Sequence, residues 1–269
     1  MASHATAWWH TSLRAIAVLN VALWSLAAVA VTREHAAIHA ATGAARYAQA
    51  LLSAVYVAGC AFRSFLPVID IPRLVLIDSR LSSVLVGRSV ATVAELCFAA
   101  QWALVLHRAA VLSGAPAAQA MSLAVIPLIV VAEACSWYAV LTTEQRAHAL
   151  ENSLWGLSAA LIVAGMLVIG PNRLAALYPL TIAGGVIYVA FIVVYDVPMY
   201  WSRWRADQAT GHGYLSIADG IAEVTRSWTV SRRWEDWRSE VPWMSLYFTF
   251  GVWSSIWLVH ASLALGNGR

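Results

Sequence analysis

Long apolar stretches alternate with short polar ones along this chain, and the apolar stretches are long enough to cross a lipid bilayer. A spanning helix needs about 20 predominantly apolar residues, and seven stretches reach this length. Because lipid offers the backbone no hydrogen-bond partners, each stretch is predicted to be a helix. The predicted spans are Thr11–Val31, Tyr47–Leu66, Arg88–His107, Ala117–Leu141, Leu150–Gly170, Leu174–Tyr200 and Val241–Leu265.

The composition supports this interpretation, because 61% of the 269 residues are hydrophobic and only 12% are charged. Soluble domains carry about 25% charged residues, so the surface of this chain must face lipid. No internal repeat divides the chain, and we expect a single transmembrane domain over residues 1–269. Ala28-Val29-Ala30 mimics a signal-peptide cleavage site, but Arg14 is the one nearby positive charge, so we expect a retained first span. The predicted fold class is an all-α polytopic integral membrane protein.

The basic residues predict an orientation. All 17 are arginine, and twelve of them lie on the side that holds the N-terminus and the second, fourth and sixth loops. Positive residues favour the cytoplasmic side, so we expect a cytoplasmic N-terminus and a C-terminus outside. Many alanines without any lysine are typical of a GC-rich genome, and we expect a bacterial inner (cytoplasmic) membrane. The absence of lysine excludes a retinal Schiff base, and a net charge of +3 does not indicate nucleic-acid binding.

Two of the cytoplasmic loops are more than linkers. Ser64–Ser83 is apolar but broken by prolines and aspartates, so we expect it to lie at the membrane interface. The sixth loop, residues 201–240, is long and contains apolar residues at helical spacing, which predicts an amphipathic helix on the inner leaflet. These residues are Ile217, Ile221, Val224 and Trp228.

The stretch from Ala132 to Leu157 carries acids inside or beside apolar runs. Glu133 and Glu151 each precede a tryptophan by four residues, so each acid lies one helical turn from an indole ring, at Trp137 and Trp155. An ionisable residue within a span costs about 2.5 kcal/mol or more and usually has a function. Apolar surroundings also favour the protonated carboxyl, which a proton donor requires.

Once the orientation is assumed, six polar residues from five predicted spans fall in the cytoplasmic half of the membrane. This convergence is the strongest indication of function in the sequence. A purely structural role is the alternative, in which the acids pair with Arg88, Arg146 and Arg203, or bond neighbouring hydroxyls and amides, and hold the helices together. The six residues are Asn20, Glu95, Glu133, His148, Glu151 and Asp196.

We therefore expect a membrane-embedded enzyme that isomerises, cyclises or otherwise rearranges an isoprenoid-like or lipid substrate. Carboxyl groups in unequal surroundings can serve as general acid and base, and aromatic faces can stabilise a developing cation. Glu133 is the leading catalytic candidate, supported by Glu95, Asp196, Glu151 and His148. The predicted substrate-binding residues are Trp137, Tyr138, Trp155, Tyr195, Asn20 and Gln101.

Two other functions stay open. The same acids could carry protons in a small-molecule transporter, with bends at Pro127, Pro198 and Gly184-Gly185. We predict no cofactor, although histidines expected on the outer side could hold a metal ion or a haem. The predicted partners are the bilayer and a lipophilic small molecule, without nucleic acid, and the oligomeric state stays open. The candidate ligands are His35, His39, His107 and His260.

Overall fold

The computed structural model describes residues 4–35, 40–171 and 178–264. Almost all of this part is helical, and six of its helices are long and apolar enough to cross a membrane. The chain is therefore a helical membrane protein. The six helices are His4–Val31, Ala44–Phe65, Val84–Leu112, Pro116–Thr142, Gln145–Ile169 and Tyr178–Thr210.

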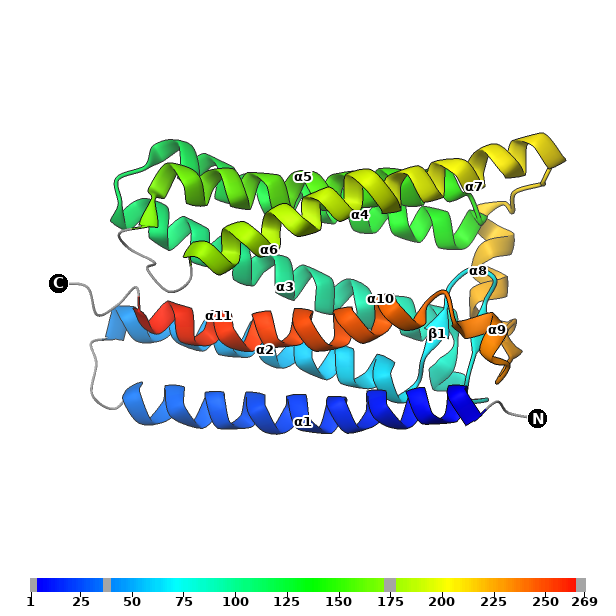
Figure 1. The fold of residues 1–269 in the computed structure, drawn as a ribbon, viewed down its shortest axis with the longest axis horizontal. Helices are drawn as coiled ribbons and strands as arrows, with labels where there is room; N and C mark the ends of the chain where they lie inside the picture. Colours follow the sequence, from blue (N-terminus) through cyan, green and yellow to red (C-terminus); the bar gives the residue numbers. More distant parts are fainter. Residues whose placement is uncertain (1–3, 36–39, 172–177, 265–269) are drawn as a thin grey trace. The chain divides into compact units, whose positions relative to one another are not determined.

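The elements follow one another along the chain as drawn in Figure 1, with three very short strands among the helices. Two segments, η3 and η4, are π-helical turns that continue the helices on either side of them. In order, the elements are α1 (His4–His35), α2 (Ala40–Phe65), β1 (Val68–Ile69), β2 (Leu74–Val75), η1 (Arg80–Ser82), α3 (Val84–Leu112), α4 (Pro116–Thr142), α5 (Gln145–Ile169), α6 (Tyr178–Phe191), η3 (Ile192–Asp196), α7 (Val197–Thr210), α8 (Ile217–Arg226), β3 (Thr229–Val230), α9 (Trp234–Trp237), α10 (Val241–Leu246), η4 (Tyr247–Gly251) and α11 (Val252–Ala264).

The seventh predicted span corresponds to a continuous helical segment formed by α10, η4 and α11. Pro242 stands in its first turn, where a missing N–H is tolerated because no earlier residue could accept its bond. Tryptophans, serines and Tyr247 make this segment more polar than the others, and it is not one of the six spanning helices. A seventh span therefore stays a prediction.

The chain forms two compact units, and α3 and α8 each pass from one to the other. The first unit comprises Met1–Gln101 and Ala222–Leu263, and the second comprises Trp102–Ile221 and Ala264–Arg269.

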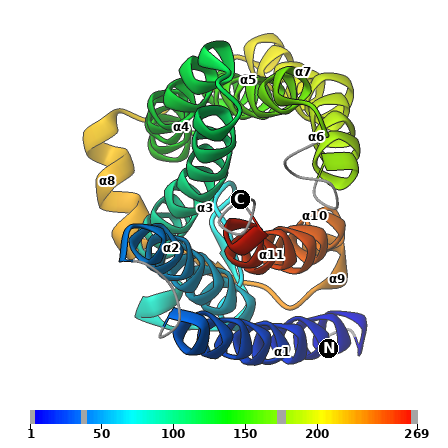
Figure 2. The same ribbon diagram turned by 90° about the vertical axis from the view of Figure 1, so that its left-hand side faces the viewer.

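In the first unit, α1 and α2 lie side by side and η4 contacts both (Figures 1 and 2). The core is aromatic. Tyr56 is stacked on Phe98, and Trp9 packs against Trp237 with ring centroids 5.7 Å apart. Burying large rings of this kind is the main source of stability in such a core, since each buries about 150–250 Å². The helices of this unit are thus held together by aromatic packing.

A small three-stranded sheet closes one end of the first unit. β1 pairs with β2 in antiparallel fashion, and β2 pairs with β3 in parallel. The indole N–H of Trp228 donates to Asp78 at 3.1 Å, and Arg73 forms an ion pair with Glu223 at 2.6 Å. The two loops predicted at this side of the membrane therefore fold against each other through backbone pairing, in addition to any contact with the interface.

The predicted amphipathic helix in the long loop is present as α8. Ile217 and Ile221 are about half exposed on it, and Val224 is buried. Trp228 was expected on the same helix, and this was wrong, because α8 ends at Arg226 and the chain then enters β3. The pairing of β3 with β2 stops the helix two residues before Trp228 and directs its indole to Asp78.

The second unit is built around α5, which contacts α4, α6, η3 and α7 (Figure 2). Gly156 allows a close approach here, because a side-chain carbon at that position would lie 2.8 Å from Ile192. The backbone N–H of Leu215 donates to Thr142, which ties the segment after α7 to the turn between α4 and α5.

The sixth predicted span was expected to end at Tyr200, but its helix continues through α7 to Thr210. Part of its expected start, residues 172–177, lies outside the described residues. Gly211 ends the helix with a positive φ of 67°, a backbone conformation that glycine adopts without strain. The first ten residues of the expected loop are therefore helical.

Candidate functional site

The predicted polar cluster divides between the two units. Asn20 and Glu95 belong to the first unit, whereas Glu133, Glu151 and Asp196 belong to the second, together with His148. A single pocket that contains all six side chains stays a prediction. The contacts of these side chains are described below for each unit separately.

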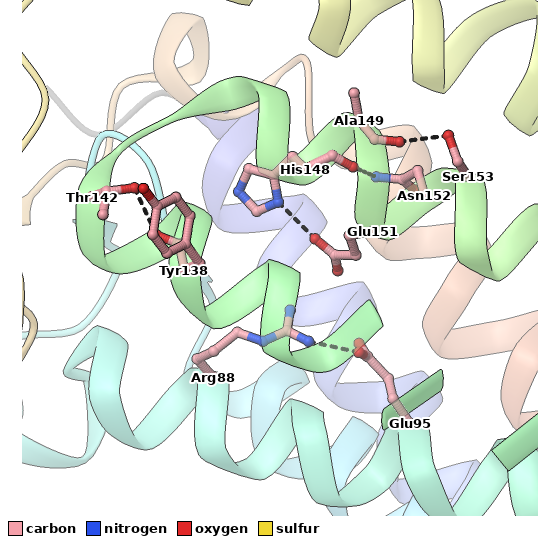
Figure 3. Close-up of polar contacts among 9 residues, drawn as sticks. All are labelled: Arg88, Glu95, Tyr138, Thr142, His148, Ala149, Glu151, Asn152 and Ser153. Carbon is pink, nitrogen blue, oxygen red and sulfur yellow. Dashed lines mark hydrogen bonds and ion pairs between the residues drawn. The ribbon is translucent and has the colours of Figure 1, made fainter. Parts of the chain in front are cut away.

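The main feature of the second unit is a histidine–carboxylate pair on the first two turns of α5. Nδ1 of His148 lies 2.7 Å from Oε2 of Glu151, and the two side chains are only 13% and 10% exposed. Figure 3 shows the imidazole pointing at the carboxylate. A carboxylate on one ring nitrogen orients the imidazole and leaves the other nitrogen, Nε2, to exchange a proton with a bound molecule.

The backbone around this pair is tied down by local bonds. The amide of Asn152 donates to the carbonyl of His148 at 2.9 Å, and the hydroxyl of Ser153 donates to Ala149 at 2.7 Å (Figure 3). The hydroxyl of Thr142, at the end of α4, donates to the carbonyl of Tyr138. The pair lies on the first two turns of α5, whose geometry fixes the spacing of the two side chains.

Asp196 lies at the same level of α5 as this pair. Further along α5, Gly156 packs against Ile192. Nearer the start of α5, the rings of His148 and Tyr200 lie 5.1 Å apart. Asp196 comes midway between Ile192 and Tyr200 in the sequence and is buried at the end of the π-helical turn. Such turns occur often at functional sites.

Glu133 is buried on α4, about two and a half turns before the turn that leads into α5. Because α4 and α5 are antiparallel neighbours, Glu133 lies deeper in the unit than Glu151, which comes seven residues after Glu144. Two of the predicted aromatic residues, Tyr138 and Tyr195, are exposed, and Trp137 and Trp155 are partly buried. Their role in lining a pocket stays a prediction.

Aromatic and cationic side chains meet near the start of α5, and the sequence interpretation missed this cluster. The ring of Tyr200 lies beside His148 and also under the guanidinium of Arg203, at 5.5 Å. The guanidinium of Arg146 lies 5.8 Å from the ring of Trp204. Tyr200 and Trp204 are four residues apart on one helix, and this spacing was the available signal.

Arg146 and Arg203 do not neutralise the deeper acids of the second unit, as one form of the structural alternative supposed. Arg146 pairs with Glu144 at 2.9 Å, and Arg203 packs on Tyr200. Neither of these contacts involves Glu133 or Asp196, the acids that they were expected to neutralise.

Glu95, in the first unit, has a different partner. Its Oε2 lies 2.7 Å from the guanidinium of Arg88, and both side chains are at least nine-tenths buried. The hydroxyl of Tyr247 donates to Oε1 at 3.4 Å. A cavity of about 10 Å³ lies beside this group, lined in part by Cys60 and Arg63. Since a single water molecule needs about this volume, the cavity has no room for a substrate.

The two amides predicted to bind substrate bond other helices of the first unit. Asn20 donates to the carbonyl of Phe248 at 2.8 Å and accepts from the indole of Trp253 at 3.0 Å. Gln101 is fully buried, donates to the carbonyl of Gln49, and accepts from Ser255. These bonds are of the kind that holds membrane helices together.

The four histidines proposed as metal ligands do not form a described site. His39 lies outside the described residues, as does the side chain of His35. His107 bonds the hydroxyl of Ser122 at 3.0 Å, and His260 is exposed beside an apolar groove of about 420 Å³. In the described part of the chain, no three histidine, cysteine or acidic side chains are grouped as a metal site would need.

The described geometry thus offers proton exchange at His148 and Glu151, with three more buried acids in the same unit, Glu133, Glu144 and Asp196. No family model, curated protein or solved structure was found to match this chain. The function is therefore argued from the side chains alone.

Proposed function

We propose that this protein is a membrane-embedded enzyme that rearranges a lipophilic, isoprenoid-like or lipid substrate by general acid/base chemistry. The observation that carries the proposal is the buried pair of His148 and Glu151 at the start of α5. Isomerisation or cyclisation suits such a pair, because one proton leaves the substrate, another is returned, and no oxidant is needed.

Each polar side chain of the predicted catalytic set has a proposed role. His148 removes the proton through Nε2, and Glu151 orients the ring and stabilises the imidazolium that forms. Glu133, deeper in the unit, returns a proton to the substrate as the general acid. Asp196 stabilises positive charge that develops on the substrate, with help from the aromatic faces of Trp137 and Trp155. Glu95 supports the fold of the first unit through Arg88.

The test uses purified protein and lipid extracts, followed by mass spectrometry for conversion of one lipid into an isomer. We expect His148→Gln and Glu133→Gln each to lower the turnover by about 10²- to 10⁴-fold, because general acid/base groups contribute that much. His212→Gln, a change of the same type in the exposed loop after α7, should leave turnover unchanged. Full turnover in both site variants would overturn the proposal.

A proton-coupled transporter is the second candidate, and the π-helical turn at Ile192–Asp196 favours it. This turn is followed by Pro198, so the helix is interrupted next to a buried acid, as in many transporters. Proton uptake by vesicles that contain the protein distinguishes the two. Uptake that requires Asp196, without chemical change of any lipid, would favour transport. The third candidate, a metal or haem at the outer histidines, is tested by metal analysis and an absorption spectrum.

We also propose the finer topology, with seven spans, a cytoplasmic N-terminus, a C-terminus outside and a bacterial inner membrane. The pairing of β2 with β3 supports one part of it, the placement of the second and sixth loops on the same side, because four predicted spans lie between them. His10, near the start of α1, also lies 3.1 Å from the carbonyl of Phe65 at the end of α2. A reporter fused to the C-terminus should be active only outside the cytoplasm, and cytoplasmic activity would contradict this topology.

A further inference from the structure

The cluster around Tyr200 and Trp204 brings cationic groups from two helices to one small area. Arg203 on α7 and His148 on α5 pack on the same tyrosine ring. Arg146, also on α5, packs on Trp204, whose ring lies 5.0 Å from that of Trp201. Tyr200 thus holds one guanidinium beside the buried histidine, and Trp204, one helical turn further on, holds the second.

The position of this cluster along its helix corresponds to the membrane surface. The helix Tyr178–Thr210 has 33 residues and is about 50 Å long, whereas the hydrocarbon core of a bilayer is about 30 Å thick. Its last turns must therefore extend beyond the hydrocarbon. These turns are polar and carry Arg203 and Arg205, both exposed. A charged headgroup of a lipid would reach this level while its tail remains in the bilayer.

The charges at this cluster leave the arginines able to bind an anion. Within the described residues, Arg203 packs on Tyr200 and has no ion pair with a carboxylate. Arg146 pairs with Glu144, but 58% of the Arg146 side chain is exposed. Glu144 is itself buried and bonds Nε of this guanidinium, so a phosphate can use the remaining N–H donors while the pair is kept. Guanidinium groups bind phosphate oxygens in pairs, which favours phosphate over other anions.

We infer that Arg203 and Arg146 bind the phosphate headgroup of a lipophilic substrate and present its tail to the proton-transfer pair of His148 and Glu151. This inference rests on the proposed function and narrows its substrate class to phosphorylated amphiphiles. The aromatic rings of Tyr200 and Trp204 orient the two guanidinium groups. His148, which shares the ring of Tyr200, then stands next to the part of the substrate nearest to the phosphate.

The test measures binding without turnover. Purified full-length protein in detergent micelles is titrated with dioleoyl phosphatidic acid, and the midpoint of thermal unfolding is followed, because a ligand that binds the folded state raises it. We expect a concentration-dependent rise, and about tenfold weaker apparent binding in Arg203→Gln and in Arg146→Gln. Arg205→Gln removes the same charge from the same helix without touching the cluster, and it should bind like the unmodified protein.

Three outcomes would overturn the inference. The first is an equal loss in Arg205→Gln, which would indicate unspecific attraction to a basic surface. The second is an equal rise with inorganic phosphate alone, which would indicate a site for a free anion. The third is an equal rise with phosphatidylcholine, which would show that binding does not depend on a terminal phosphate group. His148→Gln separates this inference from the proposed function, because it should lower turnover by about 10²- to 10⁴-fold and keep the rise in the unfolding midpoint.

Discussion

Two carboxylates with the same burial have different partners in the two units. Glu95 in the first unit and Glu151 in the second are each about one-tenth exposed, and each lies 2.7 Å from a basic group. The partner of Glu95 is the guanidinium of Arg88, which is always charged. The partner of Glu151 is the imidazole of His148, a type of group that exchanges protons near neutral pH. Burial of an acid therefore does not identify a proton-transfer site, and the nature of its partner does.

The surroundings of the two pairs also differ, because the first is enclosed and the second lies beside an exposed arginine. In the first unit, the carboxylate also receives the hydroxyl of Tyr247 and borders a cavity about the size of one water molecule. In the second unit, the histidine shares Tyr200 with the exposed Arg203. We interpret the first pair as part of the framework and the second as the part that meets a substrate.

The largest effect is expected when the pair in the first unit is broken. Arg88→Met should lower the free energy of unfolding by about 3–5 kcal/mol, because it leaves a charged carboxylate buried without its guanidinium. Thermal unfolding in detergent measures this loss. The double variant Arg88→Met, Glu95→Leu should recover most of it, since both buried charges are then absent. A single variant as stable as the parent protein would remove the structural role assigned to this pair.

The matching change in the second unit should affect turnover more than stability. Glu151→Gln keeps the shape of the side chain but removes the negative charge that stabilises the imidazolium. We expect turnover per folded molecule to fall by about 100-fold, equivalent to about 2.7 kcal/mol, while the unfolding midpoint changes little. Kinetics on the converted lipid and unfolding on the same sample measure both. Equal turnover with lower stability would make this pair structural, like the first.

Packing within the second unit is tested by two adjacent glycines of α6. Gly185→Ala should destabilise by about 1–3 kcal/mol through overpacking, because the new carbon would clash with a methyl group of Val163. The valine cannot easily turn away, since its χ1 rotamer is restricted in a helix. Gly184→Ala is the control, as nothing lies within 4 Å of its new carbon. Unfolding midpoints that are equal in the two variants would contradict the close contact of α6 with α5.

The smallest effect is expected at the end of the first unit. Glu223→Gln removes the ion pair with Arg73, in which the glutamate side chain is 40% exposed, and should cost less than about 1 kcal/mol. Glu235→Gln, whose pair with Arg233 is 4.0 Å long and well exposed, should cost nothing measurable. A loss of several kcal/mol in Glu223→Gln would mean that the small sheet supports the unit more strongly than its exposure indicates.

Much of the fold could be predicted from the sequence, because hydrophobic length is a local property. Six predicted spans correspond to long apolar helices, and α8 was found from the spacing of Ile217, Ile221 and Val224. The end of α8 could not be found in this way. It depends on the pairing of β3 with β2, whose residues are more than 150 positions away along the chain. The extension of α7 was missed because its polar residues have the composition of a loop.

The candidate site was predicted in part. The sequence by itself determined that buried acids would lie on helices within a membrane, and that His148 and Glu151 would share a helical face, because an interval of three residues is a local relation. The pair of Arg88 and Glu95 is local in the same sense, since both residues lie on α3, two turns apart. Only the tertiary structure decided that Tyr200 would join His148 to Arg203, and that Gln101 would bond Ser255. The contacts of Tyr200 with His148 and of Gln101 with Ser255 join separate helices, and they depend on how the helices pack, which no local pattern in the sequence contains.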